Sequence, residues 1–296
     1  MSSSTRPGSR RDGGATVAEA GAQHVEGRFT GARDVELYWR GTLPPAPTGV
    51  LLVCHGLGEH SGRYGNVVDA LLPDGWAVYG LDHRGHGRSG GRRAHLDAYA
   101  DWLADFHAFR GLVADRHPGL PLFLLGNSMG GQIALAYALE HGDGLRGLVL
   151  SAPALASNAV PKAAVPVLRA LARVAPTLRP AGIDTTKVSK DPAVVAAYQA
   201  DPLNHHGNPT LGLSGALYGQ FDVLPERARA LRLPLLLQHG LADVLTDPAG
   251  SRLLERTSGS PDQTVRYYDG LWHEIYNEPE RDGPLGDLRE WLAARR

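Results

Sequence analysis

Two serines of this chain stand in the pattern Gly-x-Ser-x-Gly, and their surroundings differ. Ser128 follows the apolar run 121–125 and opens the helix-favouring run 131–140, so it is predicted to lie in a sharp turn between a strand and a helix. Glycines on both sides leave room for that turn, and the hydroxyl would project above the sheet as a nucleophile. Ser89 lies in the polar loop 82–91 with no helix directly after it, and we interpret it as a structural residue of a glycine-rich loop at the rim of the site.

A serine hydroxyl attacks an acyl carbonyl efficiently only when a neighbouring histidine, oriented by a carboxylate, takes its proton. Where the serine sits between a strand and a helix, the carboxylate and then the histidine follow it along the chain. Asp243 stands a few residues after an apolar, strand-like run, and His273 follows another such run. The rival carboxylate Asp247 precedes a proline and is interpreted as a helix N-cap. The sequence thus predicts a catalytic triad of Ser128, Asp243 and His273.

Cleavage of an acyl bond also requires N–H donors for the negative charge that develops on the carbonyl oxygen. One donor is expected from Met129, directly after the nucleophile. The second is expected from Leu57, because the glycines on either side of it let the backbone of the loop 55–60 approach a substrate. His55 of this loop is interpreted as a brace for it.

The remaining candidates for chemistry have plainer interpretations. His239 is predicted to sit at the end of a strand, whereas His205 and His206 leave open a role in a substrate channel. The single cysteine, Cys54, lies in an apolar run, and one cysteine excludes both an internal disulfide and a multi-thiolate metal site. The sequence therefore predicts a reaction that needs neither a metal nor a cofactor.

The elements that must position these residues alternate between short apolar runs and longer helix-like segments, which is typical of βα units around a mostly parallel sheet. The runs are nearly all apolar, so helices are expected on both faces of the sheet. Six runs are predicted as strands, namely 49–54, 76–81, 121–125, 145–150, 233–238 and 264–268.

A proline-rich stretch with helical signals interrupts this strand pattern and is predicted to be an inserted cap. Residues 1–26 are then a disordered tail, residues 27–152 and 227–296 form the core, and residues 153–226 form the cap. The whole is predicted to be an α/β-hydrolase fold, with a mostly parallel central sheet, helices on both faces and an inserted helical cap.

One segment of the cap is amphipathic, with apolar side chains on one side of a helix and basic ones opposite. A cap helix that packs its apolar face onto the core explains this pattern. Contact with lipid explains it too, since an apolar face backed by basic residues can settle on a membrane or a micelle. The apolar side consists of Val160, Ala164, Val167, Leu171, Val174 and Leu178, and the basic side of Lys162, Arg169 and Arg173.

The composition excludes several classes of function. Lys and Arg (30) nearly balance Asp and Glu (31), so no excess of positive charge draws the chain to nucleic acid. The N-terminal residues lack the apolar stretch of a secretory signal, and no apolar run is long enough to span a membrane. The expected location is therefore the cytoplasm, with peripheral contact to a membrane left open.

Five motifs can be compared with known families, and they are residues 55–64, 82–91, 127–131, 151–153 and 273–279. Taken together, they resemble the monoacylglycerol lipase group of α/β-hydrolases, especially its bacterial members. The resemblance covers nearly everything from about residue 27 and extends into the cap through residues 191–198 and 201–207. It departs at Asn127, since the family usually has histidine before the nucleophile.

The resemblance implies hydrolysis of a single fatty-acyl ester of glycerol, with a cap that forms a hydrophobic channel for the acyl chain and a small polar pocket for glycerol. It also implies Tyr198 of the cap as a contact for the glycerol head, although a cap tyrosine is as often a packing residue. His55 and Glu59 of the loop after the first predicted strand are further candidate substrate contacts.

The resulting hypothesis is a serine hydrolase that cleaves monoacylglycerol to fatty acid and glycerol through an acyl-enzyme. A carboxylesterase, lysophospholipase or peptidase of the same fold is an open alternative, because the fold hosts many chemistries. A non-catalytic module that binds a lipid or a partner protein is an alternative of another class. The expected partner is a fatty-acyl ester, and the oligomeric state stays open.

Overall fold

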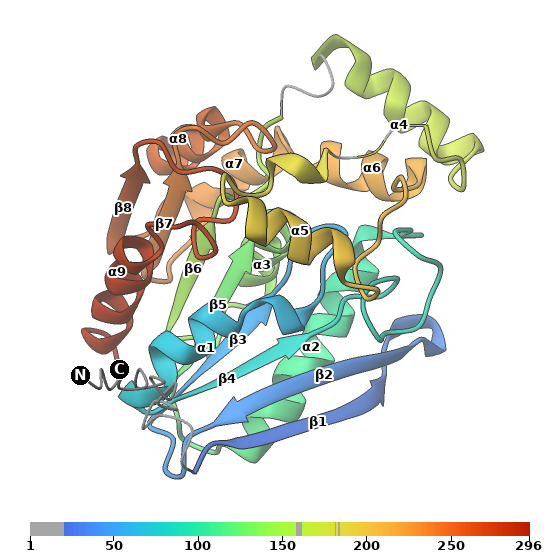
Figure 1. Cartoon of the computed structure of the whole chain (residues 1–296). Helices are drawn as coiled ribbons and strands as arrows, with labels where there is room; N and C mark the ends of the chain where they lie inside the picture. Colours follow the sequence, from blue (N-terminus) through green and yellow to red (C-terminus); the bar gives the residue numbers. More distant parts are fainter. Residues whose placement is uncertain (1–20, 158–161, 181, 183) are drawn as a thin grey trace, which may run out of the picture.

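The computed structural model describes residues 21–157, 162–180, 182 and 184–296 (Figure 1). Within these residues, eight strands form one sheet in the order β1-β2-β4-β3-β5-β6-β7-β8. β2 pairs antiparallel with β1 and with β4, and all other neighbours are parallel, which confirms the predicted mostly parallel sheet. The strands span Gln23–Thr30 (β1), Glu36–Leu43 (β2), Gly49–Cys54 (β3), Trp76–Leu81 (β4), Leu122–Asn127 (β5), Gly147–Ser151 (β6), Leu235–Gly240 (β7) and Gln263–Tyr268 (β8).

Helices cover both faces of this sheet (Figure 1). Successive side chains of a strand point to opposite faces, so Leu52 packs toward Phe106 and Ile133 whereas Leu51 packs toward Val67 and Leu288. Two cores therefore sandwich the sheet, which explains why its central strands are apolar throughout. The first core lies against α2 (Tyr99–Arg116), α3 (Met129–His141) and α8 (Pro248–Thr257), and the second against α1 (Gly65–Leu71) and α9 (Asp282–Ala293).

The predicted strands all exist, and their bounds differ from the observed ones by at most two residues. β5 and β7 begin directly after Pro121 and Pro234, because a proline has no N–H to donate to the sheet. The predicted tail is wrong at its end, since β1 begins at Gln23. Val25 and Phe29 of β1 are only partly buried at the edge of the sheet, so the strand lacks the apolar run that identifies the central strands. Residues 1–20 of the predicted tail lie outside the described residues.

The chain between β6 and β7 carries α4 (Val165–Val174), α5 (Pro192–Ala200), α6 (Leu211–Tyr218) and α7 (Val223–Arg227). α5 and α6 lie over the carboxyl ends of the strands, and α4 packs on α6 at the outer side (Figure 1). α7 instead packs against α3 and α8 of the core. The predicted boundary of the cap at residue 226 therefore falls inside a helix that belongs with the core.

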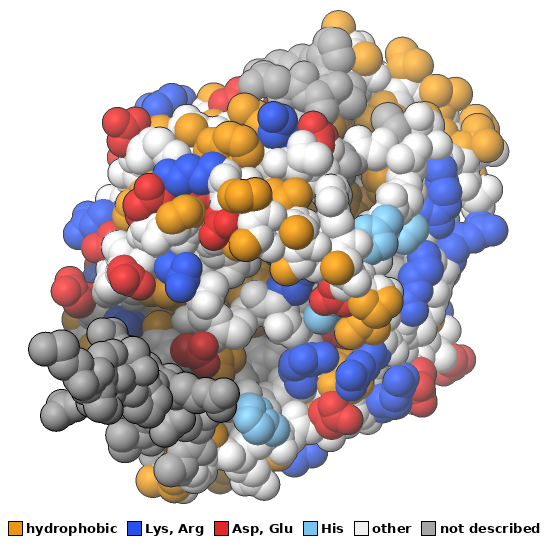
Figure 2. Space-filling view, viewed as in Figure 1, with side chains coloured by type: hydrophobic (Ala, Val, Ile, Leu, Met, Phe, Trp, Pro, Cys, Tyr) orange, Lys and Arg blue, Asp and Glu red, His pale blue; other side chains and the backbone are white. Residues whose placement is uncertain are grey.

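The apolar side of α4 and of the turn after it faces outward. Val167, Leu171, Val174 and Leu178 are 60%, 47%, 80% and 59% exposed, and Figure 2 shows hydrophobic side chains gathered over α4. α4 meets α6 through another face, where Ala172 lies beside Gly215. The interpretation that the apolar side packs onto the core is therefore wrong for these four side chains. Val160 and the Lys162 side chain lie outside what the structure describes.

The carboxyl ends of β3, β5, β7 and β8 meet at one edge of the sheet because these strands are parallel. The loops that follow them are therefore gathered beneath the cap (Figure 1), where ligands of open α/β sheets bind. No helix in the described part of the chain is both long and apolar enough to cross a membrane.

Candidate active site

Ser128 lies in the turn between β5 and α3, as predicted. Its φ of 55° and ψ of −121° are strained for a residue with a side chain, and such strain is typical of functional sites. The surrounding backbone holds this conformation, because the Ser128 N–H donates to the Ser151 carbonyl (3.0 Å) and its carbonyl accepts from the Ala154 N–H (2.9 Å). Asn127 and Met129 on either side are buried, whereas Ser128 is partly exposed. The turn thus presents the serine hydroxyl at the edge of the sheet.

Close packing around this turn requires glycine. A Cβ on Gly130 would overlap the Cys54 carbonyl at the end of β3, and a Cβ on Gly126 would overlap the Gly130 carbonyl. α3 can therefore begin directly against the carboxyl end of β3. The loop after β3 lies beside Ser128 as a result, since a Cβ on Gly56 would lie 3.3 Å from the Cβ of Ser128.

His273 and Asp243 follow the neighbouring strands β8 and β7, and the structure brings their side chains together. Nδ1 of His273 lies 2.7 Å from Oδ2 of Asp243, and both residues are buried. Because an ionised carboxylate can only accept, Nδ1 carries the proton and donates it to this bond. The other ring nitrogen, Nε2, is left as the proton acceptor that a general base needs.

The Asp243 carboxylate has further partners that the sequence analysis did not identify. Oδ2 also lies 3.2 Å from Nε2 of His239 and accepts from the Thr246 hydroxyl at 2.8 Å. Oδ1 accepts from the N–H groups of Leu245 and Thr246 at 2.8 and 3.1 Å. His239 sits at the end of β7 as predicted, and Ser251 engages its Nδ1 at 2.7 Å. No spacing pattern in the sequence marks these residues, because the loop fold alone turns them toward the carboxylate.

Burial and pairing act in opposite directions on the charges of Asp243 and His273. Burial raises the pKa of Asp243 and lowers the pKa of His273, because it disfavours both charged forms. The surrounding charges and hydrogen bonds together outweigh burial. The pKa of Asp243 is lowered by His273 and His239, and the pKa of His273 is raised from its ordinary value of 6.5 by Asp243 and, less strongly, by Glu274 and Glu59. Asp243 is therefore ionised at neutral pH, and His273 is a stronger base than free imidazole.

The loop after β3 is held by the buried carboxylate of Glu59. Its Oε1 accepts from the Gly56 N–H at 2.5 Å and from the Tyr64 hydroxyl at 2.9 Å. Its Oε2 accepts from Nη1 of Arg63 at 2.9 Å. These bonds use both oxygens, so Glu59 shapes the turn that contains the Leu57 N–H.

The His55 ring is fully buried under the same loop. Its Nε2 accepts from the His83 N–H at 2.9 Å, so Nδ1 carries the proton and donates to the Gly56 carbonyl at 2.8 Å. Burial lowers the pKa of His55 to about 4, which keeps the ring neutral near pH 7. With both nitrogens occupied, His55 braces the loop and has no free group for a substrate.

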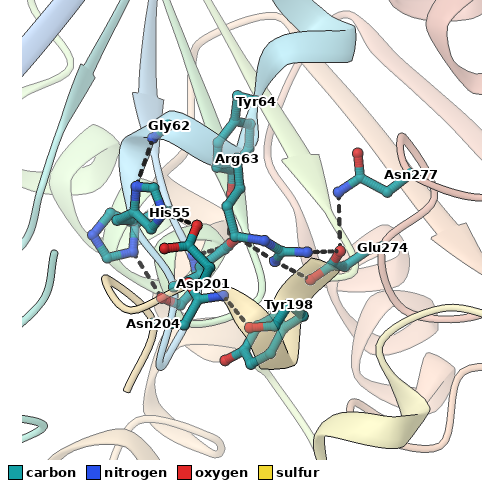
Figure 3. Close-up of polar contacts among 12 residues, drawn as sticks. His55, Gly62, Arg63, Tyr64, Tyr198, Asp201, Asn204, Glu274 and Asn277 are labelled. Atoms are coloured by element: carbon teal, nitrogen blue, oxygen red, sulfur yellow. Dashed lines mark hydrogen bonds and ion pairs between the residues drawn. The ribbon is translucent and has the colours of Figure 1, made fainter. Parts of the chain in front are cut away.

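Arg63 joins this loop to the chain after β8, as Figure 3 shows. Its Nη1 and Nη2 donate to the two carboxylate oxygens of Glu274 at 2.5 and 2.7 Å, and Nη1 also reaches Glu59. The guanidinium carbon lies 4.5 Å from the centre of the Tyr198 ring. A two-pronged, buried ion pair of this kind fixes geometry as well as charge. It therefore links three parts of the site: residues 55–60, which we call the donor loop because Leu57 is the expected N–H donor, the cap, and the residue that follows His273.

Tyr198 on α5 places its hydroxyl beside the donor loop, since a Cβ on Gly58 would lie 2.8 Å from that oxygen. The hydroxyl forms no hydrogen bond with any described residue. Two contacts hold the cap in this place. The His205 N–H donates to the Gly58 carbonyl at 2.8 Å, and Nε2 of His60 lies 2.9 Å from Oδ2 of Asp201.

Asn127, where the resemblance departs, is buried at the end of β5. Its side-chain amide forms no hydrogen bond with the described residues. Asn127 borders a small cavity of about 10 Å³, which is room for about one water molecule. The cavity is lined by Glu59, Arg63, Tyr64, Val67, Asn127, Glu274, Tyr276 and Asn277.

Ser89 and Asp247, the two rival candidates for the triad, hold parts of the fold together. Ser89 is buried, its hydroxyl donates to the Asp82 carbonyl at 2.5 Å, and it accepts from the Tyr38 N–H at 2.8 Å. It therefore joins its loop to β2. Asp247 caps α8, where it accepts from the Ala249 N–H at 2.8 Å, as the sequence predicts.

The side chains of the two cap histidines and of the cysteine form no hydrogen bond with Ser128, Asp243 or His273. Nε2 of His205 lies 3.4 Å from the Asn208 carbonyl, and Nε2 of His206 lies 3.0 Å from the Asp201 carbonyl. Burial raises the pKa of the Cys54 thiol, which keeps it protonated. Among the described residues, no group of three or more His, Cys, Asp or Glu side chains is placed to hold a metal ion.

Parallel strands that end in a strained serine, a carboxylate and a histidine, in that order along the chain, define the α/β-hydrolase class of serine hydrolases. The family model described as "Serine aminopeptidase, S33" matches residues 45–280. A monoacylglycerol lipase of Mycolicibacterium smegmatis is 42% identical over 279 residues, which cover 94% of this chain and 99% of that protein. The monoglyceride lipase of Rattus norvegicus is 32% identical over 262 residues, which cover 87% of this chain and 86% of that protein.

Solved structures agree with the sequence comparisons. The monoacylglycerol lipase of Paleococcus ferrophilus superposes with a TM-score of 0.79 at 32% identity, covering 88% of this chain and 99% of its own. A carboxyl esterase from Bacillus coagulans in complex with glycerol superposes with a TM-score of 0.78 at 25% identity, covering 93% and 99%. The chain belongs to the S33 family, within its monoacylglycerol lipase group, and is a serine ester hydrolase.

Proposed function

We propose that this enzyme hydrolyses monoacylglycerol to a free fatty acid and glycerol, with Ser128, Asp243 and His273 as its catalytic triad. The observation that carries the proposal is the 2.7 Å contact between His273 and Asp243 at the sheet edge that also holds the strained Ser128. The 42% identity with a protein named monoacylglycerol lipase supports the substrate class.

The proposed reaction is acyl transfer in two halves. Nε2 of His273 takes the hydroxyl proton of Ser128 while its oxygen attacks the ester carbonyl carbon. The N–H groups of Leu57 and Met129 stabilise the oxyanion, and His273 returns the proton to glycerol as the carbon–oxygen bond breaks. Water then attacks the acyl-enzyme with the same proton transfers, which releases the fatty acid and restores Ser128.

The polar end of the substrate is proposed to meet Tyr198. Its hydroxyl is free of other hydrogen bonds within the described residues and stands beside the donor loop. Glu59 and Arg63 form hydrogen bonds with each other and with their neighbours, so we propose that they support the pocket. We propose that Tyr198 contacts a glycerol hydroxyl.

Profiling the released acid tests the substrate class. Purified enzyme is compared with its Ser128→Ala variant on monoacylglycerols, diacylglycerols, lysophospholipids and aminoacyl amides. We expect the highest kcat/KM on monoacylglycerols and no activity in the variant. Preference for an amide, a diacylglycerol or a lysophospholipid would reject monoacylglycerol as the substrate, while activity in the variant would reject Ser128 as the nucleophile.

We further propose that α4 and the turn after it contact a membrane or micelle transiently. The four exposed apolar side chains of this segment support the proposal, because water solvates such a cluster poorly. Arg173 of α4 is exposed and forms no ion pair with a described residue, so anionic lipid is the expected surface.

Co-sedimentation with vesicles of phosphatidylcholine alone, or mixed with phosphatidylglycerol, tests this contact. Val174→Glu should weaken vesicle binding roughly tenfold, because it places a charge where two exposed methyl groups are proposed to enter the lipid. Val223→Glu is the matched control, since Val223 is a 42% exposed valine on α7. Equal binding of both variants and the wild type would exclude the proposed surface.

A further inference from the structure

The N–H groups of the two residues that flank His273 each donate to a specific acceptor. The N–H of Glu274 donates to the carbonyl of Val188 in the cap at 2.8 Å. The N–H of Trp272 donates to Oε2 of Glu278 at 3.4 Å. The backbone on both sides of His273 is therefore fixed, on one side by the cap and on the other by a carboxylate.

Glu278 is completely buried, and its second oxygen binds the cap. Oε1 accepts from the N–H of Lys190 at 2.8 Å, while Nζ of Lys190 lies 4.0 Å from Oε2. We name residues 184–191 the cap strap. One carboxylate thus joins the cap strap to the loop that carries His273. Both of its oxygens must accept a backbone N–H, which a carboxylate does and an amide does not.

The cap strap continues directly into the helix above the site. Asp191 ends the strap and caps α5 by accepting from the Ala193 N–H at 2.8 Å. α5 carries Tyr198, on which Arg63 stacks, and Arg63 pairs with Glu274. Displacement of the strap would therefore disturb the Val188 carbonyl, which accepts from the Glu274 N–H, and Arg63, which pairs with the Glu274 carboxylate. Figure 3 shows the second of these contacts beside Tyr198.

We propose that Glu278 is a positioning residue for the reaction, which locks the cap strap to the His273 loop so that His273 takes its working position only while the strap is seated. The inference rests on the proposed function only in that His273 is the base of ester hydrolysis. A base displaced by a fraction of an ångström transfers protons poorly, because catalysis depends on near-attack geometry. Cap movements that lift the strap therefore slow the chemistry in addition to opening the site.

Glu278→Gln keeps the size of the side chain and presents an NH₂ group to one of the two backbone N–H groups. We expect kcat to fall about 10- to 100-fold, by the same factor on p-nitrophenyl acetate and on a long-chain monoacylglycerol, with KM nearly unchanged. Labelling of Ser128 by a fluorophosphonate should slow equally. Glu280→Gln is the matched control, because Glu280 binds Nζ of Lys190 at 2.8 Å but is exposed; its rates should equal those of the wild type.

Hydrogen exchange separates positioning from general damage. In the Gln variant, faster exchange should be confined to peptides covering 184–191 and 270–278. A wild-type kcat, or a loss seen only in KM for the long-chain substrate, would overturn the proposal and make Glu278 a packing residue of the cap. Should the Gln variant fail to fold, Glu278→Asp, which keeps the charge on a shorter side chain, is judged by the same criteria. If the wild type cleaves the acetate but not monoacylglycerol, the proposed substrate fails while the acetate measurements still decide the role of Glu278.

Discussion

Replacing Asp243 with asparagine tests the proposed triad most directly. The carboxylate accepts at both oxygens, from the ring of His273 and from two backbone N–H groups of its own loop. An asparagine oxygen satisfies the two backbone groups best, which turns its NH₂ toward His273. The histidine must then accept at Nδ1 and carry its proton on Nε2, so it cannot take the proton of Ser128.

The wrong tautomer should lower kcat by about 10⁴-fold, which corresponds to about 5 kcal/mol of the activation barrier. The acid limb of kcat/KM should also move. Activity requires neutral His273. In the wild type burial lowers its pKa, while the charge and hydrogen bond of Asp243, together with the charges of Glu274 and Glu59, raise it by more. Removing the Asp243 charge leaves burial, the largest single influence, less opposed, so the acid limb of Asp243→Asn should lie at lower pH.

The assay is hydrolysis of p-nitrophenyl butyrate across the acid limb, with the melting temperature as a check on folding. Asp247→Asn is the control, since asparagine caps a helix about as well as aspartate and the α8 cap should persist. The reasoning is refuted if Asp243→Asn keeps more than about a tenth of the wild-type kcat, or if its acid limb moves to higher pH.

Three further changes have definite expected results. Ser128→Ala should abolish fluorophosphonate labelling and lower kcat by about 10⁶-fold, and retained labelling would identify another nucleophile. Glu59→Gln should lower kcat on a soluble ester at least about tenfold, because one donor of the loop loses its acceptor; an unchanged kcat would show that the loop holds without it. Gly130→Ala should lower the free energy of unfolding in urea by about 3 kcal/mol through overlap with the Cys54 carbonyl, whereas Gly286→Ala on α9, with no atom near the added Cβ, should be neutral or slightly stabilising.

The central strands could be predicted because burial on both faces demands apolar residues at every position, as in β3 and β5. β1 could not, because only its inward side chains Val25 and Phe29 meet the core, and alternation over one edge strand is a weak signal. The sequence also could not predict that the apolar face of α4 points outward. An amphipathic pattern shows that a helix has two faces but not which of them a neighbour covers, and Gly215 draws another face of α4 onto α6.

The candidate site divides along the same line. The turn that holds Ser128 can be predicted from the sequence, because a strand, a sharp turn and a helix must follow one another in the chain, and Asp243 and His273 follow it in the expected order. The sequence by itself therefore determined which side chains we propose to do the chemistry. The contacts that hold these side chains could not be predicted from the sequence, because Arg63 pairs with Glu274, and Glu278 binds Lys190, across long stretches of chain. Only the tertiary structure decided these pairs, because parallel strands bring loops from distant parts of the sequence to one edge and the inserted cap closes over them.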